Sequence, residues 1–207
     1  MKFEKTTLSG KVNRLYMSIY PDIAYDDPDY FVTQSVDELE CTPEGIMGDR
    51  HFGFVTASGG RVTDLYDKGT PMKNNRQWLA LSYEEVVEIA DNLGIEGKLT
   101  PELLGANLLI EGLGKMSNLP SMTYLVISPD ENYKSTKQDN VVLVVYGQAL
   151  PCKIAGKALV EPCGDSSLEK KFPKGAMELR GATGWIEKGG VIRPDYIVHA
   201  LTPKGID

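Results

Sequence analysis

The chain has 207 residues, of which 42% are hydrophobic and 25% charged, the usage of a folded globular protein rather than a disordered one. Its formal net charge of -7 and pI of about 5.0 exclude the broad basic surface of a typical nucleic-acid binder. The sequence shows no apolar signal core at its start and no run long enough to cross a bilayer, so we expect a cytoplasmic protein that binds neither nucleic acid nor membrane.

The first third of the chain predicts short strands and loops. Apolar and polar residues alternate over residues 11–19, as in a half-buried strand, and residues 31–39 can form a second strand. Residues 54–75 are rich in Gly, Asn and Asp and predict a long irregular loop. Loops of this length inside a compact domain are often functional or mobile.

One helix is predicted with clear start and stop signals. A short strand over residues 77–81 leads to Ser82 and Glu85, whose spacing is that of a capping box, in which each side chain bonds the other residue's free backbone amide. Apolar residues then recur on one face, and Gly94 stands where helices commonly end.

The rest of the chain predicts further short strands with turns between them. A one-turn helix is expected at residues 100–104, a polar surface loop at 128–140 and weak, interrupted helix at 154–171. The expected strands are residues 107–110, 123–127, 141–146, 181–187 and 195–201. Since no linker divides these pieces, we predict one mainly β domain over residues 1–207, a closed or nearly closed β-barrel with a few short helices.

Cys152 follows the most apolar predicted strand, at the point where Gly and Pro residues break it. Lys153 beside it and Lys157 one helical turn further on would bring positive charge to the thiol, which favours the nucleophilic thiolate. The alternative is inert packing, because cysteine is among the residue types most often buried.

The other cysteines do not form a recognisable site with Cys152. Cys41 and Cys163 complete an odd set of three without a CxxC pair, so neither a disulfide framework nor a four-cysteine zinc site is indicated. Cys163 could resolve an oxidised Cys152 or have no chemical role.

A second candidate site is the glycine-punctuated run Gly48-Asp49-Arg50-His51. Its three polar side chains could position an anion, orient a proton transfer or only hold a loop, since Asp and Gly are natural turn formers. The chain has only two histidines, which excludes a histidine-rich metal site. His199 alternates with apolar neighbours in the last predicted strand, and we interpret it as structural.

Five motifs occur in the order seen in MOSC domains, which are named for the C-terminal domain of molybdenum cofactor sulfurase. The motifs are Gly45-Ile-Met-Gly-Asp-Arg-His-Phe-Gly53, Arg76-Gln-Trp-Leu-Ala-Leu-Ser82, Gly105-Ala-Asn-Leu-Leu-Ile-Glu-Gly112, Pro151-Cys152 and Arg180-Gly-Ala-Thr-Gly-Trp-Ile-Glu-Lys-Gly-Gly190. The resemblance runs from about Val12 to Val198 and so covers nearly the whole chain.

The resemblance implies a β-barrel that works with the molybdenum cofactor, molybdopterin. It points to Cys152 as the signature residue, either a thiolate ligand to molybdenum or a sulfur carrier, and both roles require a thiolate. It further implies Asp49 and His51 as catalytic residues. The implied cofactor-binding residues are Gly48, Arg50, Arg76, Asn107 and Arg180, with Arg76 and Arg180 suited to the pterin phosphate.

Three functions remain open from the sequence. The first is a stand-alone reductase of N-hydroxylated small molecules, the second a sulfur-carrier or cofactor-delivery module that holds a persulfide on Cys152, and the third a binding protein without activity. The chain shows no pyridoxal-phosphate desulfurase domain and no companion pterin-binding domain. We therefore expect a small-molecule substrate or cofactor and a separate redox or desulfurase protein as partners.

Overall fold

The computed structural model describes residues 3, 8–59 and 62–204. The strands are β1 (Leu8–Ser18), β2 (Thr33–Val36), β3 (Leu39–Thr42), β4 (Gly45–Ile46), β5 (Val55–Ala57), β6 (Pro71–Lys73), β7 (Trp78–Ser82), β8 (Leu108–Glu111), β9 (Tyr124–Ser128), β10 (Val141–Gln148), β11 (Ala182–Lys188), β12 (Gly190–Ile192) and β13 (Ile197–Leu201). The helices are α1 (Tyr83–Leu93), α2 (Lys153–Lys157), α3 (Val160–Cys163) and α4 (Leu168–Gly175), with short 3-10 turns η1 (Pro28–Phe31), η2 (Pro101–Leu104) and η3 (Met116–Asn118).

A closed β-barrel forms the centre of the molecule. Its strands follow the order β13-β9-β10-β11-β7-β8-β1, and β13 pairs back onto β1, which closes seven strands into a ring. β2 extends the sheet from β1 as an eighth strand. The β7–β8 pair is parallel because α1 and η2 form a crossover between the two strands. The predicted barrel is thus confirmed.

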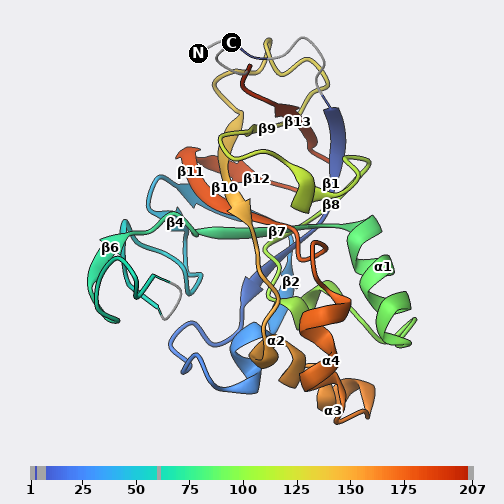
Figure 1. The fold of residues 1–207 in the computed structure, drawn as a ribbon. Helices are drawn as coiled ribbons and strands as arrows, with labels where there is room; N and C mark the ends of the chain where they lie inside the picture. Colours follow the sequence, from blue (N-terminus) through green and yellow to red (C-terminus); the bar gives the residue numbers. More distant parts are fainter. Residues whose placement is uncertain (1–2, 4–7, 60–61, 205–207) are drawn as a thin grey trace.

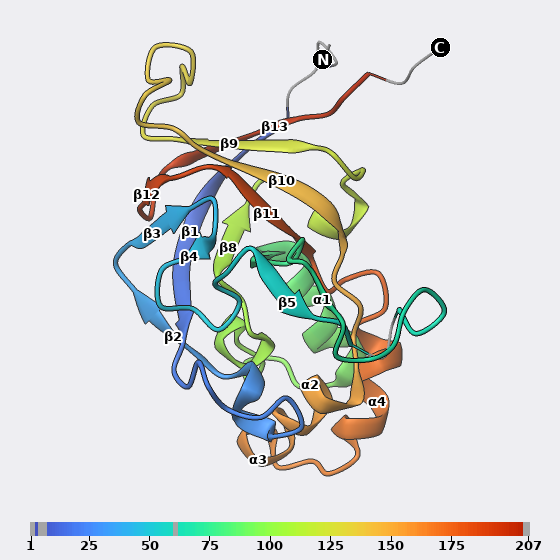
Figure 2. The same cartoon turned by 90° about the vertical axis from the view of Figure 1, so that its left-hand side faces the viewer.

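The helices gather at one end of the barrel. Figures 1 and 2 show α2, α3 and α4 beyond the lower end of the sheet, with α1 along its side, and Figure 2 shows the segment after β1 passing beside α2. Among the described residues, none of these helices has the length and apolar character needed to cross a bilayer.

The start and stop of α1 follow the sequence signals. The Glu85 amide donates to Ser82 Oγ over 3.1 Å, and the Ser82 amide donates to Glu85 Oε2 over 3.2 Å, so the predicted capping box is present. Gly94 ends the helix with φ +65°, the left-handed conformation that glycine adopts without steric cost.

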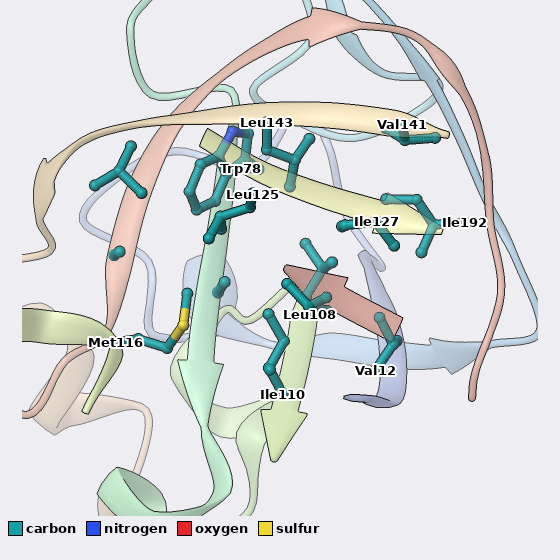
Figure 3. Close-up of a cluster of buried hydrophobic side chains, with 14 of the residues drawn as sticks. Val12, Trp78, Leu108, Ile110, Met116, Leu125, Ile127, Val141, Leu143 and Ile192 are labelled. Carbon is teal, nitrogen blue, oxygen red and sulfur yellow. The ribbon is translucent and has the colours of Figure 1, made fainter. Parts of the chain in front are cut away.

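Two apolar layers meet at the barrel wall. One fills the barrel interior, where Trp78, Leu108, Ile110 and Leu125 point toward one another (Figure 3). The other lies between the wall and the helices. Successive side chains of β7 alternate between the two layers, since Trp78 and Ala80 face the interior while Leu81 packs against the helices.

Two predictions along the chain are wrong in detail. The expected strand over residues 31–39 is divided: η1 ends at Phe31, β2 occupies only Thr33–Val36, and β3 belongs to a separate small sheet with β4 and β12. Exposed Asp37 and Glu38 separate β2 from β3. The expected irregular loop over residues 54–75 contains a short antiparallel hairpin of β5 and β6, an arm that Figure 1 shows projecting from the barrel.

His199 on β13 is a buried histidine outside the helical end. Its side chain is 7% exposed, its ring centroid lies 4.8 Å from that of Tyr133, and its Nδ1 lies 3.3 Å from Ser9 Oγ. Burial lowers the pKa of His199 below its ordinary value, although the Asp130 backbone and the Glu131 charge act in the opposite direction.

We expect His199 to make stability depend on pH on the acid side of neutrality. The unfolded chain takes up a proton near pH 6.5 that the folded chain resists. Stability from this residue is therefore full above about pH 6.5 and declines as pH falls toward the lower folded-state pKa. The free energy of unfolding, measured with urea at pH 7.5 and pH 5.5, should change less between the two pH values for His199→Phe than for wild type. Equal changes in the two proteins would contradict the expectation.

Candidate functional site

A cavity of about 180 Å³ lies where the helical end meets the barrel. It draws on the segment after β1, the Gly48–His51 turn, the start of β7 and the segments that flank α2 and β11. Its lining residues are Ser18, Tyr25, Tyr30, Phe31, Asp49, Arg50, His51, Arg76, Trp78, Leu79, Gly105, Ala149, Leu150, Cys152, Arg180 and Thr183. Three arginines and one thiol therefore share a single cavity in an acidic protein.

Cys152 stands between β10 and α2, as the break after the predicted strand indicated. Its backbone is extended, with φ -139° and ψ 164°, and its carbonyl accepts from the Gly156 amide over 3.2 Å as α2 begins. The thiol is half-buried, and the Tyr25 hydroxyl donates to its Sγ over 3.9 Å. Lys153 and Lys157 are exposed and neither lines the cavity, so the positive charge there comes from arginines, not from the expected lysines.

The Arg50 guanidinium is held in place by three contacts with two residues. Its Nε donates to Ser18 Oγ over 2.8 Å, its Nη1 donates to the Tyr30 carbonyl, and its Cζ lies 4.2 Å from the centre of the Tyr30 ring. Burial lowers the pKa of Arg50, but an arginine remains protonated in proteins. Arg50 is therefore a fixed positive charge in the cavity wall.

Arg180 is the most deeply placed cation of the site, with 3% of its surface exposed. Its Cζ lies 5.6 Å from the centre of the Phe31 ring and 5.8 Å from that of Phe172, so aromatic faces from η1 and α4 surround the guanidinium. Arg76 lies on the same cavity, and its backbone amide donates to Asn74 Oδ1 over 3.1 Å. Rigid arginine forks are well suited to binding an anionic group.

Asp49 is a buried carboxylate, and both of its oxygens accept hydrogen bonds from neighbouring groups. Oδ2 accepts from the Ser18 amide, the Ser18 hydroxyl and Asn107 Nδ2 at 3.2, 2.9 and 3.0 Å. Oδ1 accepts from the His51 amide at 3.1 Å and lies 3.3 Å from His51 Nδ1. Burial alone would raise the pKa of Asp49, but the bonds and charge of His51 and the Ser18 amide outweigh it and lower the pKa to about 2.

This arrangement assigns different tasks to Asp49 and His51. Because Asp49 stays ionised and fully bonded near neutral pH, it orients its neighbours and is a poor proton donor. The His51 side chain is 40% exposed, and its Nδ1 faces the carboxylate. Its Nε2 is therefore the ring atom available for proton exchange with a bound molecule or solvent.

Most of the residues predicted from the sequence converge on the cavity. Cys152, Asp49, Arg50, His51, Arg76 and Arg180 all line it, whereas Gly48 and Asn107 do not. Gly48 supports the turn with φ +79°. Asn107 lies behind Asp49, where its Oδ1 accepts from the Leu79 amide over 2.9 Å and its Nδ2 donates to Asp49. Asn107 thus positions Asp49 from behind the cavity lining.

Sequence reasoning missed the aromatic wall of the cavity. Tyr25 and Tyr30 come from a stretch in which no strand or helix was predicted, and Phe31 from the start of the predicted strand over residues 31–39. The centroid of the Tyr25 ring lies 5.0 Å from that of Tyr30 and 6.4 Å from that of Phe31, each pair edge to face. Three aromatic residues within seven positions were the available signal, but their partners lie far away in the chain.

The fold and site define a class of protein: a seven-stranded barrel with a cavity lined by arginines and a cysteine. The family model of the MOSC domain matches residues 50–199, and the chain belongs to this family. MOSC domains are associated with the molybdenum cofactor.

Two comparisons concern the same Bacillus subtilis protein. The curated protein of strain 168 named "Putative metal-sulfur cluster biosynthesis proteins YuaD" is 29% identical over 200 residues, which cover 95% of this chain and 94% of the relative. A crystal structure of the YUAD protein from Bacillus subtilis superposes with a TM-score of 0.81 and 26% identity, covering 96% of this chain and 99% of that one. The crystal structure of YiiM from Escherichia coli matches with a TM-score of 0.53 and 16% identity, covering 97% and 72%, which shows the shared fold alone.

The residues of the cavity fit such a cofactor in charge and in donor type. Within the described residues, no group of three or more His, Cys, Asp or Glu side chains is arranged to hold a metal ion. A metal beside Cys152 would therefore need to bring other ligands with it, as molybdenum does in its pterin cofactor. The thiolate would be a soft ligand for the metal, and the arginines would match an anionic phosphate.

Proposed function

We propose that this protein binds the molybdenum cofactor in the arginine-lined cavity, with Cys152 as the protein ligand to the metal, and reduces N-hydroxylated small molecules. The observation that carries the proposal is the convergence of Cys152, Arg50, Arg76 and Arg180 on one cavity. A soft ligand and several fixed positive charges at a single place match a molecule that carries both a metal and an anionic group.

The volume of the cavity supports partial enclosure of the cofactor. Pockets that surround a whole drug-sized ligand measure about 300 to 1,000 Å³, and this cavity measures about 180 Å³. We therefore assign the enclosed part to one end of the cofactor. Arg76 and Arg180 bind the phosphate in this proposal, and Arg50 adds a positive charge held by Ser18 and Tyr30.

The chain's own residues supply positioning and protons. When bound, the cofactor supplies a metal centre that accepts and returns electrons. Reduction of an N-hydroxylated compound breaks the N–O bond and consumes two electrons and two protons, yielding the amine or related N–H compound and water. The electrons come from a redox protein partner. His51, held through Nδ1 by ionised Asp49, exchanges protons with substrate through Nε2.

Metal content tests the role of Cys152. Wild-type protein expressed in a host that makes the cofactor should contain about one molybdenum per chain. The molybdenum content of Cys152→Ala should be lower by a factor of about ten or more. Cys163→Ala is the matched control, because Cys163 is buried in α3 and does not line the cavity. The measurement is inductively coupled plasma mass spectrometry after gel filtration. Equal molybdenum in the wild type and Cys152→Ala would refute the proposed ligand.

A second candidate function is sulfur transfer, favoured by the half-buried position of Cys152 in the cavity lining and by the name of the Bacillus subtilis relative. In this function the Cys152 thiolate attacks the outer sulfur of a desulfurase persulfide. A new S–S bond forms on Cys152, and the S–S bond of the donor breaks to release its thiolate. Intact-mass spectrometry after incubation with a desulfurase and cysteine would then show one added sulfur atom in wild type and Cys163→Ala, but none in Cys152→Ala.

A further inference from the structure

Tyr25 lies beside the sulfur of Cys152 in the cavity lining. It lines the cavity, its side chain is 51% exposed, and its hydroxyl donates to Cys152 Sγ over 3.9 Å. A hydrogen bond to sulfur at this distance is weak, so the bond alone does not hold the side chain in place. The edge-to-face contacts of its ring with Tyr30 and Phe31 add support for the side chain.

The surface beneath Tyr25 is firmly anchored. Asp27 caps η1 by accepting from the Asp29 amide over 2.9 Å, and Arg50 binds both the carbonyl and the ring face of Tyr30. Tyr25 itself lies in a stretch supported by turn hydrogen bonds, such as the one from the Asp27 amide to the Ala24 carbonyl over 3.1 Å. An exposed ring thus rests on a fixed aromatic wall.

We propose that Tyr25 is a gate over Cys152 that determines which reactants reach the sulfur. With the ring against Tyr30 and Phe31, small reactants reach Sγ and bulky ones are excluded. Rotation of the exposed side chain away from the wall admits larger molecules. Two edge-to-face ring contacts favour the closed position by about tenfold. The inference rests on the proposed function only in taking Cys152 as the functional thiol of the site. The open position admits the cofactor to the sulfur, and the closed position admits only small compounds.

Thiol alkylation tests the gate without a cofactor. The rate of labelling at Cys152 is measured with iodoacetamide, a small reagent, and with fluorescein-5-maleimide, a bulky one, and the site is confirmed by peptide mass spectrometry. Cys41 and Cys163 are buried and serve as internal references. The variants are Tyr25→Ala, Tyr25→Phe and the matched control Tyr20→Ala, since Tyr20 is also 51% exposed on the same segment but does not line the cavity.

We expect Tyr25→Ala to raise the ratio of bulky to small labelling rates by about tenfold. Tyr25→Phe and Tyr20→Ala should keep the wild-type ratio, because the aromatic ring at position 25 is retained in both. The gate is refuted if Tyr25→Ala leaves the ratio unchanged, if Tyr20→Ala raises it equally, or if Tyr25→Phe behaves like Tyr25→Ala. The assay needs neither molybdenum nor a desulfurase. An unchanged labelling ratio would therefore refute the gate and leave the expected molybdenum and persulfide contents untouched. Absence of both molybdenum and persulfide would refute the proposed function and leave the labelling ratio untouched.

Discussion

Asp49→Asn is expected to destabilise the protein by about 3 kcal/mol at neutral pH. The carboxylate of Asp49 accepts from Ser18, Asn107 and His51 inside the protein. An amide keeps one acceptor oxygen and presents N–H donors in place of the other oxygen, so the groups that donate to the replaced oxygen lose their acceptor. Each such group costs about 1–3 kcal/mol. The positive charge of half-buried Arg50 also loses its nearby negative charge.

The pH dependence of this effect has a defined sign. The pKa of Asp49 is about 2 in the folded protein, below the value of about 3.9 for an aspartate in an unfolded chain. The ionised group therefore stabilises the fold fully above about pH 4, and this stabilisation is lost as pH falls through about 2.

Urea unfolding of wild type and Asp49→Asn at pH 7 and pH 3 measures both effects. The difference in the free energy of unfolding between the two proteins should be smaller at pH 3 than at pH 7. Asp91→Asn, on the exposed side of α1, is the control and should change stability by less than about 0.5 kcal/mol. A loss below about 1 kcal/mol for Asp49→Asn at pH 7 would show that the buried network contributes little.

Gly184→Ala is expected to destabilise the barrel by about 3 kcal/mol or more. A Cβ at this position of β11 would lie 1.8 Å from the Val144 carbonyl oxygen of the paired strand β10 and 2.7 Å from Cζ2 of Trp78. Neither atom can move away easily, since one belongs to the backbone of the barrel and the other to the indole of Trp78, which is 1% exposed. The methyl group can fit only if β10 and β11 separate or Trp78 leaves its position.

Gly147→Ala on β10 is the matched control for this crowding. The nearest atom to a Cβ there is Ser121 Oγ at 4.0 Å, so the change should stay within about 1 kcal/mol of wild type. Thermal unfolding followed by circular dichroism should show Tm lower by about 6–12 °C for Gly184→Ala only. Similar Tm values for both variants would mean that the close approach of the two strands is not limiting.

The accuracy of the sequence predictions follows the range of the interactions involved. The capping box of Ser82 and Glu85 and the stop at Gly94 were predictable because all the atoms involved lie within a few residues. The apolar run of β10 was also predictable, since burial on both faces requires it. By contrast, residues 31–39 do not form one strand because β3 pairs with β12, which lies about 150 residues further along the chain. That pairing could not be read from residues 31–39 alone.

The candidate site shows the same division. Cys152 and the run from Gly48 to His51 were selected from the residues themselves, whereas Arg76, Arg180 and Asn107 came through the resemblance to MOSC domains. The structure brings Cys152, Asp49, Arg50, His51, Arg76 and Arg180 to one cavity, and Gly48 and Asn107 lie outside its lining. The local argument that Lys153 and Lys157 bring charge to the thiol stays a prediction, since both side chains are exposed and neither lines the cavity.

The sequence by itself determined the mainly β barrel, the capped helix and the position of Cys152 directly after a strand, because strand and helix periodicities and turn residues act locally. Only the tertiary structure decided what surrounds the sulfur. Tyr25 and Cys152 are separated by 127 positions, and they meet because barrel closure and helix packing bring the segment after β1 beside α2. Contacts of that range depend on the packing of the whole chain, so they became visible only in the folded structure.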